Sequence, residues 1–126
     1  MSNKDITIVI TSFKSDQIIG NCLNSIDRQC KTILVENSSN VEFKKNVEKE
    51  FNNVECILSG ENMGYGRANN IGLKKVTTKY ALILNPDATL HPSALKNFVK
   101  ATEKNPDFAI MAPYIQKKKI RMTKII

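Results

Sequence analysis

The carboxylate of Asp87 comes just after the apolar run 81–84, separated from it only by Asn85 and Pro86. Such a run is typical of a buried strand, so we expect Asp87 just past the carboxyl end of that strand. Proteins often hold Mg²⁺ or Mn²⁺ with one or two carboxylates, while water and substrate phosphates fill the remaining positions. The segment therefore predicts a Mg²⁺ or Mn²⁺ site at Asp87. A plain turn before the next helix is the alternative.

A second segment, residues 61–72, is rich in glycine and asparagine. Gly64 and Gly66 permit a close approach of the backbone to a ligand, and the helix expected after them would offer free N–H groups to an anion. Arg67 could form a bidentate contact with phosphate. The segment predicts a site for a nucleotide-linked diphosphate, and a flexible loop with a solvated arginine is the alternative. Asn69 replaces the third glycine of a dinucleotide fingerprint, which excludes a nicotinamide dehydrogenase.

Apolar runs alternate with segments of helical periodicity along the chain. The runs predict strands over 6–10, 32–35, 54–58, 80–84 and 108–112, and the periodic segments predict helices over 16–28, 43–51, 68–76 and 92–102. Because the strand segments are apolar throughout rather than alternating, we expect an α/β fold, with a mostly parallel sheet and helices on both faces.

Four polar clusters follow the carboxyl ends of the first four predicted strands, at 11–13, 36–39, 59–67 and 85–87. In open parallel sheets, ligands bind at this edge. We therefore expect the four clusters to form one site.

Bulk composition limits the class of protein. The 126 residues support one domain, and the 41% hydrophobic and 25% charged content is typical of soluble globular proteins. No apolar run approaches the length of a membrane span, and the N-terminus lacks the features of a signal peptide, so we expect a cytoplasmic protein. Cys22, Cys30 and Cys56 are odd in number and lack metal-site spacing, which favours buried free thiols.

The net charge of +7 is concentrated at the C-terminus. Five basic residues lie in 117–126, and the rest of the chain has 14 basic against 12 acidic residues, so no broad basic face for nucleic acid is expected. We interpret 1–116 as the folded domain and 117–126 as a basic tail that is irregular or results from a truncated reading frame. The alternative is a polybasic segment that touches anionic lipid at the inner face of the membrane.

Taken together, the segments 11–13, 35–39, 62–72 and 84–87 resemble the family-2 glycosyltransferases of the GT-A fold in order and spacing. The resemblance extends from about residue 6 to residue 113. Segments 62–72 and 84–87 are most similar to the branch that includes bacterial rhamnosyltransferases. The chain would then be the N-terminal, donor-binding part of such an enzyme.

The resemblance implies roles for individual residues. Thr11 and Phe13 would flank the donor base, Glu36 and Asn37 would contact the base or ribose, and Arg67 would lie near the base or diphosphate, with Asp87 as the metal ligand. The other implied donor-site residues are Asn62, Gly64, Gly66, Asn69 and Asn85. Two positions depart from the family pattern: Asn85 replaces the first carboxylate of its aspartate-any-aspartate motif, and Glu36 stands where aspartate is usual.

Family members are substantially longer, and the half after the metal motif supplies the acceptor site and the general base. Glu103 and Asp107 are the carboxylates that follow Asp87 here, and both fall where a helix end and a turn are expected, so we expect the base to be absent.

The resemblance therefore implies that the chain is the donor-binding half of an inverting, metal-dependent glycosyltransferase for cell-surface polysaccharide. Its donor would be a nucleoside-diphosphate sugar, such as dTDP-rhamnose or a UDP-sugar, and its acceptor a saccharide or lipid-linked saccharide. The alternative is a non-catalytic nucleotide-sugar-binding module or a degenerate remnant. A sugar-phosphate nucleotidyltransferase ranks lower, because no glycine-rich loop follows the first predicted strand. A truncated chain would also expose a surface that favours a homo-oligomer.

Overall fold

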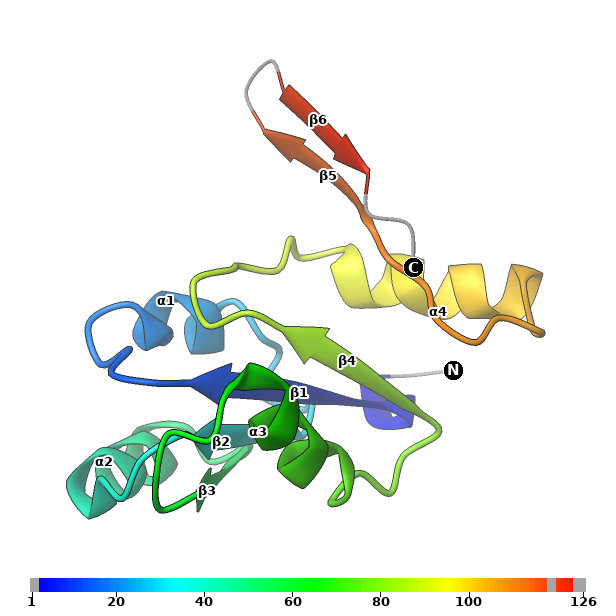
Figure 1. Ribbon diagram of the computed structural model, residues 1–126. Helices are drawn as coiled ribbons and strands as arrows, with labels where there is room; N and C mark the ends of the chain where they lie inside the picture. The colour runs from blue at the N-terminus through cyan, green and yellow to red at the C-terminus, as the bar shows by residue number, and fades with distance from the viewer. Residues whose placement is uncertain (1–2, 118–119, 124–126) are drawn as a thin grey trace.

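The computed structural model describes residues 3–117 and 120–123. Its centre is a four-stranded sheet in the order β3-β2-β1-β4, formed by β1 (Ile6–Ser12), β2 (Thr32–Glu36), β3 (Val54–Leu58) and β4 (Tyr80–Leu84). Every pairing in it is parallel. Figure 1 shows β1 and β4 running side by side in the same direction. The carboxyl ends of all four strands therefore lie at one edge of the sheet.

Helices cover the two faces of the sheet unequally. A short 3-10 helix, η1 (Asn3–Asp5), precedes β1, and the α-helices are α1 (Ile19–Asn24), α2 (Val41–Glu50), α3 (Tyr65–Leu73) and α4 (Ala94–Lys104). Residues of α1, α2 and α4 share one buried cluster with Ile8, Ile10 and Leu34, whereas α3 packs through Ala68 against Ile33 and Val35 on the other face. The predicted α/β class, with a mostly parallel sheet covered on both faces, is confirmed.

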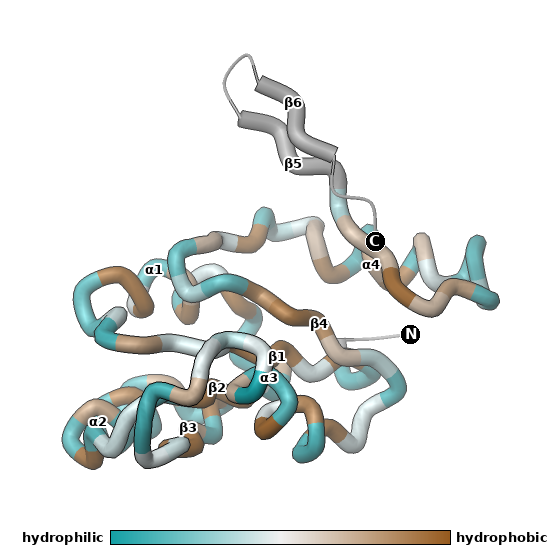
Figure 2. Tube along the Cα trace, viewed as in Figure 1, coloured by the Kyte–Doolittle hydropathy of each residue, from teal (hydrophilic) through white to brown (hydrophobic). Residues whose placement is uncertain are grey.

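Burial of the strands follows from this arrangement. Every residue of the central strand β1 is buried, as its continuous apolar run predicts. β4 alternates instead: Leu82 packs on the larger core, whereas Ile83 on the opposite face is 46% exposed. α3 lies over β1 and β2, and in the part of the chain that the structure describes β4 pairs only with β1. Figure 2 shows the hydrophobic stretch of β4 followed by hydrophilic residues where the strand ends.

The predicted fifth strand over 108–112 is wrong. This segment follows a turn, in which the Phe108 amide donates to the Asn105 carbonyl, and runs without regular structure to Pro113. The Phe108 ring stacks on Tyr80 with 5.7 Å between centroids, so side-chain packing rather than backbone pairing holds it near β4. An apolar run becomes a strand only where a neighbouring strand accepts its hydrogen bonds.

The boundaries of all four α-helices also differ from the prediction. α2 begins two residues earlier than predicted, at Val41, and α1 ends at Asn24 rather than at 28. α1 begins at Ile19 rather than at 16, because residues 16–18 form a turn in which the Ile19 amide donates to the Ser15 carbonyl. α3 begins at Tyr65, three residues earlier than predicted. α4 begins at Ala94 with Ser93 in the N-cap position, so Pro92 precedes the helix.

Two short strands form a second, separate sheet. β5 (Tyr114–Lys117) and β6 (Ile120–Thr123) pair antiparallel and project away from the sheet (Figure 1). The predicted boundary between residues 116 and 117 therefore falls within β5. Lys118, Lys119 and Lys124 of the predicted basic tail lie outside the described residues.

Cys22, Cys30 and Cys56 are all buried and free, as predicted. Burial raises the pKa of each thiol from 9.0 to about 11, and a nearby carboxylate adds to the shift for Cys22 and Cys30. These thiols stay protonated near neutral pH and contribute as small apolar side chains. No helix in the described ranges has the length and apolar character needed to cross a bilayer.

Candidate functional site

The four polar clusters meet at the carboxyl edge of the sheet, as predicted. Side-chain hydrogen bonds join them, and each bond connects two segments that are distant in sequence. The pairs are Thr11–Asn69, Ser12–Glu36, Asn37–Asn62 and Tyr65–Asn85, at 2.7, 2.8, 3.0 and 2.7 Å. The rim of the sheet is thus one connected polar surface.

The end of β1 carries one buried side chain, Thr11, and is followed by one exposed side chain, Phe13. Thr11 is 5% exposed and donates its hydroxyl proton to the Asn69 side chain on α3. Phe13 is 42% exposed, and Lys14, with a φ of 52°, turns the chain away immediately after it. The Lys14 ammonium lies over the Phe13 ring, 5.2 Å from its centroid, so a planar ligand could stack on the other face. Thr11 and Asn69 hold β1 against α3.

Glu36 at the end of β2 is 2% exposed. Its two carboxylate oxygens accept hydrogen bonds from the hydroxyls of Ser12 and Ser38. The longer side chain of glutamate reaches both serines from the strand end. The direct contact between Glu36 and a base or ribose that the resemblance implies stays a prediction.

Asn37 is also 2% exposed, and it bridges the loop after β2 to the loop after β3. Its amide nitrogen donates to the Asn62 side chain at 3.0 Å and to the Gly64 carbonyl at 3.3 Å. Its oxygen accepts from the Ser59 hydroxyl at 2.8 Å and from the Met63 amide at 3.1 Å. The side chain thereby fixes the path of residues 59–64.

The N-terminus of α3 faces the same rim. Gly64 has a φ of 87° and forms the N-cap, a conformation that favours glycine over other residues. Gly66 lies inside the first turn with open space around the position of a Cβ, so packing does not require a glycine there. Arg67 is exposed, and within the described residues its guanidinium forms no hydrogen bond or salt bridge.

The Asn85–Asp87 turn lies beside this helix. Tyr65, the first residue of α3, donates its hydroxyl proton to the Asn85 side chain. Asp87 is exposed, and it lies close enough to α1 for its charge to add to burial in raising the pKa of the Cys22 thiol. Tyr65 could not be selected from the sequence beyond its place between two glycines, because its partner is 20 residues away.

Asp87 fits a cation that takes a single protein carboxylate. It is exposed and forms no described salt bridge, and in the described part of the chain no three His, Cys, Asp or Glu side chains gather as a metal cluster. A Mg²⁺ or Mn²⁺ ion held here would take its other ligands from water and phosphate oxygens.

The remaining candidate carboxylates lie at the opposite edge of the sheet. Glu103 lines a hollow with Lys79, Tyr80 and Phe108, beside the amino end of β4. Asp107 directly precedes Phe108. Glu103 and Asp107 therefore lie toward the amino end of β4, whereas Asp87 follows its carboxyl end.

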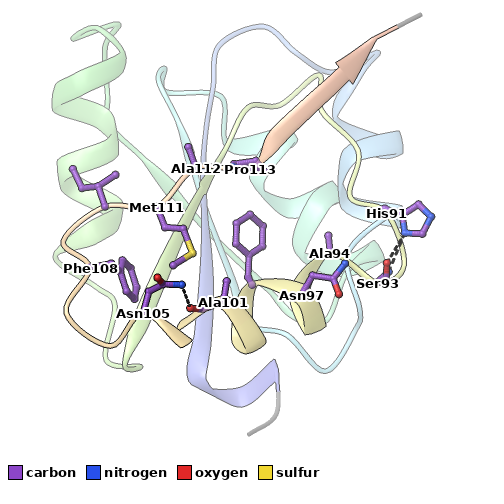
Figure 3. A pocket seen from close by; sticks show the side chains of 12 residues that line it. His91, Ser93, Ala94, Asn97, Ala101, Asn105, Phe108, Met111, Ala112 and Pro113 are labelled. Atoms are coloured by element: carbon purple, nitrogen blue, oxygen red, sulfur yellow. Dashed lines mark hydrogen bonds between the residues drawn. The ribbon is translucent and has the colours of Figure 1, made fainter. Parts of the chain in front are cut away.

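A cavity of about 780 Å³ lies between α4 and residues 108–113 (Figure 3). Its lining is mostly apolar and includes Ala101, Phe108, Met111 and Pro113. Asn105 also lines it, but donates its amide proton to the Ala101 carbonyl. His91, Ser93 and Asn97 line its other end, and none of the predicted donor-site residues borders it.

Two curated proteins are similar to this chain. It is 26% identical over 115 residues to the low-salt glycan biosynthesis hexosyltransferase Agl10 of Haloferax volcanii, covering 88% of this chain and 36% of that protein. It is 30% identical over 103 residues to a teichoic acid poly(glycerol phosphate) polymerase of Staphylococcus epidermidis, covering 75% of this chain and 14% of that protein. The chain thus spans about a third or less of the length of these relatives.

Solved structures of S. aureus TarS share the fold. TarS 1–349 in complex with UDP-GlcNAc superposes with a TM-score of 0.69 at 19% identity, over 79% of this chain and 31% of that one. A further TarS structure gives a TM-score of 0.70 at 18% identity, over 81% of this chain and 20% of that one. The expected GT-A arrangement is confirmed.

A sequence model described as glycosyl transferase family 2 matches residues 7–124. This match includes all four polar clusters of the rim and the strands that place them at one edge. The chain therefore belongs to glycosyltransferase family 2.

Proposed function

We propose that this chain forms the donor-binding part of an inverting, metal-dependent glycosyltransferase that uses a nucleoside-diphosphate sugar. The observation that carries the proposal is the connected rim, in which the Tyr65–Asn85 bond at 2.7 Å links the helix bearing Arg67 to the turn bearing Asp87. An exposed guanidinium and an exposed carboxylate on two linked segments suit a diphosphate together with its cation.

Different side chains of the rim would bind the base, the diphosphate and the cation. Phe13 would stack on the base, while Arg67 and the first N–H groups of α3 would receive the diphosphate. Asp87 would hold the cation, which supplies charge neutralisation to the departing diphosphate when bound. Similarity to TarS, whose structure contains UDP-GlcNAc, supports a UDP-sugar donor. dTDP-rhamnose remains the second candidate donor, and a saccharide or lipid-linked saccharide the acceptor.

Calorimetric titration tests this proposal. The chain is titrated with UDP and with dTDP, each with and without Mn²⁺, and the titrations are repeated on Asp87→Asn. We expect metal-dependent binding of at least one nucleotide, and a loss of about tenfold or more in affinity in the variant, because the neutral amide no longer attracts the cation.

The matched control is Asp107→Asn, which makes the same chemical change at an exposed position beyond the opposite edge of the sheet. It should bind as the unaltered chain does. Equal weakening by both substitutions, or no nucleotide binding under any condition, would contradict the proposal.

A non-catalytic nucleotide-sugar-binding module is the second candidate function. The position of Glu103 and Asp107 favours it, because neither carboxylate lies at the rim where an acceptor hydroxyl would be deprotonated. Under this alternative the chain binds UDP but does not release it from UDP-GlcNAc when saccharide acceptors are added. Sustained transfer to any acceptor, detected by mass spectrometry of the product, would exclude the module.

A further inference from the structure

The side chain of Asn37 uses both of its amide protons and accepts a main-chain hydrogen bond. A primary amide offers two protons and two lone pairs. Asn62 and Gly64 accept the two protons, and the Met63 amide donates to the oxygen. The Ser59 hydroxyl also lies 2.8 Å from this oxygen, but it shares its single proton with a backbone carbonyl at 2.7 Å. Asn37 could therefore donate to a ligand only by giving up one of its two bonds to the loop after β3.

Main-chain partners fix the orientation of this amide. The Met63 amide can only donate, so the side-chain oxygen of Asn37 must face it, and the Gly64 carbonyl can only accept, so the nitrogen must face that. Asn62 extends the network, because its side-chain oxygen also accepts from the Gly64 amide at 3.1 Å. An asparagine side chain provides the donors and the acceptor that this position requires.

The network ends at the first turn of α3. Gly64 is the N-cap of that helix, and its carbonyl accepts from the Ala68 amide as well as from Asn37. A second link runs beside it, since the Gly60 amide donates to the Ser38 carbonyl at 2.9 Å. The loop after β2 thus sets where the N–H groups at the start of α3 point.

We infer that Asn37 is a positioning residue, which holds residues 59–64 and the N-terminus of α3 in place for a diphosphate and does not itself contact the nucleotide. This inference rests on the proposed function for its ligand. The positioning of residues 59–64 rests on the hydrogen-bond network and does not depend on the proposed function. Donation to a base or ribose, a contact implied by family resemblance, would require breaking the network.

Asn37→Asp tests the inference with almost no change in shape. The carboxylate places an acceptor against the Gly64 carbonyl and the Asn62 oxygen, so two hydrogen bonds become repulsive contacts. Hydrogen exchange of the ligand-free chain should show faster exchange at the Met63 and Gly64 amides, with the strands of the sheet unchanged. Asn46→Asp, on the exposed side of α2, makes the same substitution outside the network and should leave this exchange unaltered.

Titration with ligand fragments separates positioning from direct contact. If Asn37 orients the diphosphate site, Asn37→Asp weakens UDP and inorganic pyrophosphate by the same factor, about tenfold or more, and leaves uridine unchanged. Because the new carboxylate also repels anions directly, the uncharged variant Ser59→Ala must show the same pattern to a smaller degree. A residue that touched the base or ribose would weaken UDP and uridine while pyrophosphate kept its affinity. That second pattern would overturn the inference, as would weaker UDP binding without faster exchange in the loop.

Ser59→Ala provides a second variant if the aspartate prevents folding. It removes one donor to the Asn37 oxygen and should produce a smaller change of the same sign in both measurements. If the unaltered chain binds neither UDP nor pyrophosphate, the proposed function fails. The exchange of Met63 and Gly64 then decides the positioning role alone, and unchanged exchange in Asn37→Asp would refute it.

Discussion

At the scale of single residues, Glu36 stands where the family resemblance leads us to expect aspartate, and its side chain contacts two serines. Its carboxylate is buried at the end of the central pair of strands and is neutralised by no described salt bridge. The hydroxyls of Ser12 and Ser38 satisfy it instead. A hydrogen bond to a charged group contributes more than one between neutral groups, so this cluster stabilises the edge that carries the site.

Shortening this side chain should weaken the edge of the sheet. In Glu36→Asp, one carboxylate can no longer reach both serines, and we expect the free energy of unfolding to fall by about 1–3 kcal/mol. Urea denaturation measures the change. Glu42→Asp, on an exposed position of α2, is the control and should be neutral. Equal stability of Glu36→Asp and the unaltered chain would show that the serines do not depend on the longer side chain.

The residue types of the site could be predicted from sequence, but their partners could not. Asn37, Arg67 and Asp87 follow strand ends that are visible as apolar runs, so their gathering at one edge follows from a parallel sheet. The bond of Tyr65 to Asn85 depends on the spacing of α3 from β4, which no local pattern encodes. Asn37 lies 26 residues from the Met63 amide, and no local pattern indicates that contact either.

At the scale of elements, α3 determines how closely the diphosphate region approaches the sheet. A Cβ on Gly72 would lie 2.6 Å from Val9 Cγ1 and 3.2 Å from Val35 Cγ2, both in the central strands. The helix rests on β1 and β2 at this glycine. This contact therefore sets the distance between the N-terminus of α3 and the strand ends that form the rim.

Two glycine substitutions in this helix should have opposite effects. Gly72→Ala overpacks the contact with β1, and we expect it to lower the free energy of unfolding by about 1–3 kcal/mol. Gly66→Ala meets open space and should be neutral or stabilising by up to about 1 kcal/mol, because alanine favours the helix. Thermal and urea unfolding compare the two. Equal destabilisation would mean that backbone conformation, rather than contact with Val9, requires the glycines.

Element types were predictable where the local signal was strong. β1 to β4 follow from apolar runs, and α2 and α4 from apolar residues at helical spacing. Residues 108–112 carry a comparable apolar run and form no strand, because pairing depends on a neighbour that sequence does not reveal. The shortened α1 has a local cause: the Ser25 hydroxyl donates to the Cys22 carbonyl at the end of the helix, in competition with the backbone.

At the scale of the whole molecule, the sheet is covered unequally. Among the described residues, three helices pack on one face, while α3 alone covers the other, and it does so over β1 and β2. Ala81 and Ile83 of β4 are exposed on that second face, and in the described part of the chain the outer edge of β4 has no strand beside it. An open edge with exposed apolar residues promotes association.

Charging this surface should reduce self-association. We expect the chain to associate as its concentration rises, and Ile83→Lys to shift it toward the monomer, with the free energy of unfolding changed by no more than about 0.5 kcal/mol. Sedimentation velocity over a concentration series measures this. Val41→Lys alters an apolar residue on α2 that is 54% exposed, somewhat more than Ile83, and should not change association. A chain that stays monomeric throughout, or an Ile83→Lys variant that associates as strongly, would contradict the expectation.

The strand order β3-β2-β1-β4 also determines when the site can form during folding. β1 meets β2 across a short stretch of chain, with Ser12 and Glu36 only 24 residues apart. It meets β4 across a much longer one, since Thr7 bonds Thr78 over 71 residues, and closing a longer loop costs more chain entropy. β1, β2 and β3 can therefore pair before β4 brings Asp87 to the edge of the sheet. The carboxylate proposed to hold the cation reaches the site only when β4 pairs with β1.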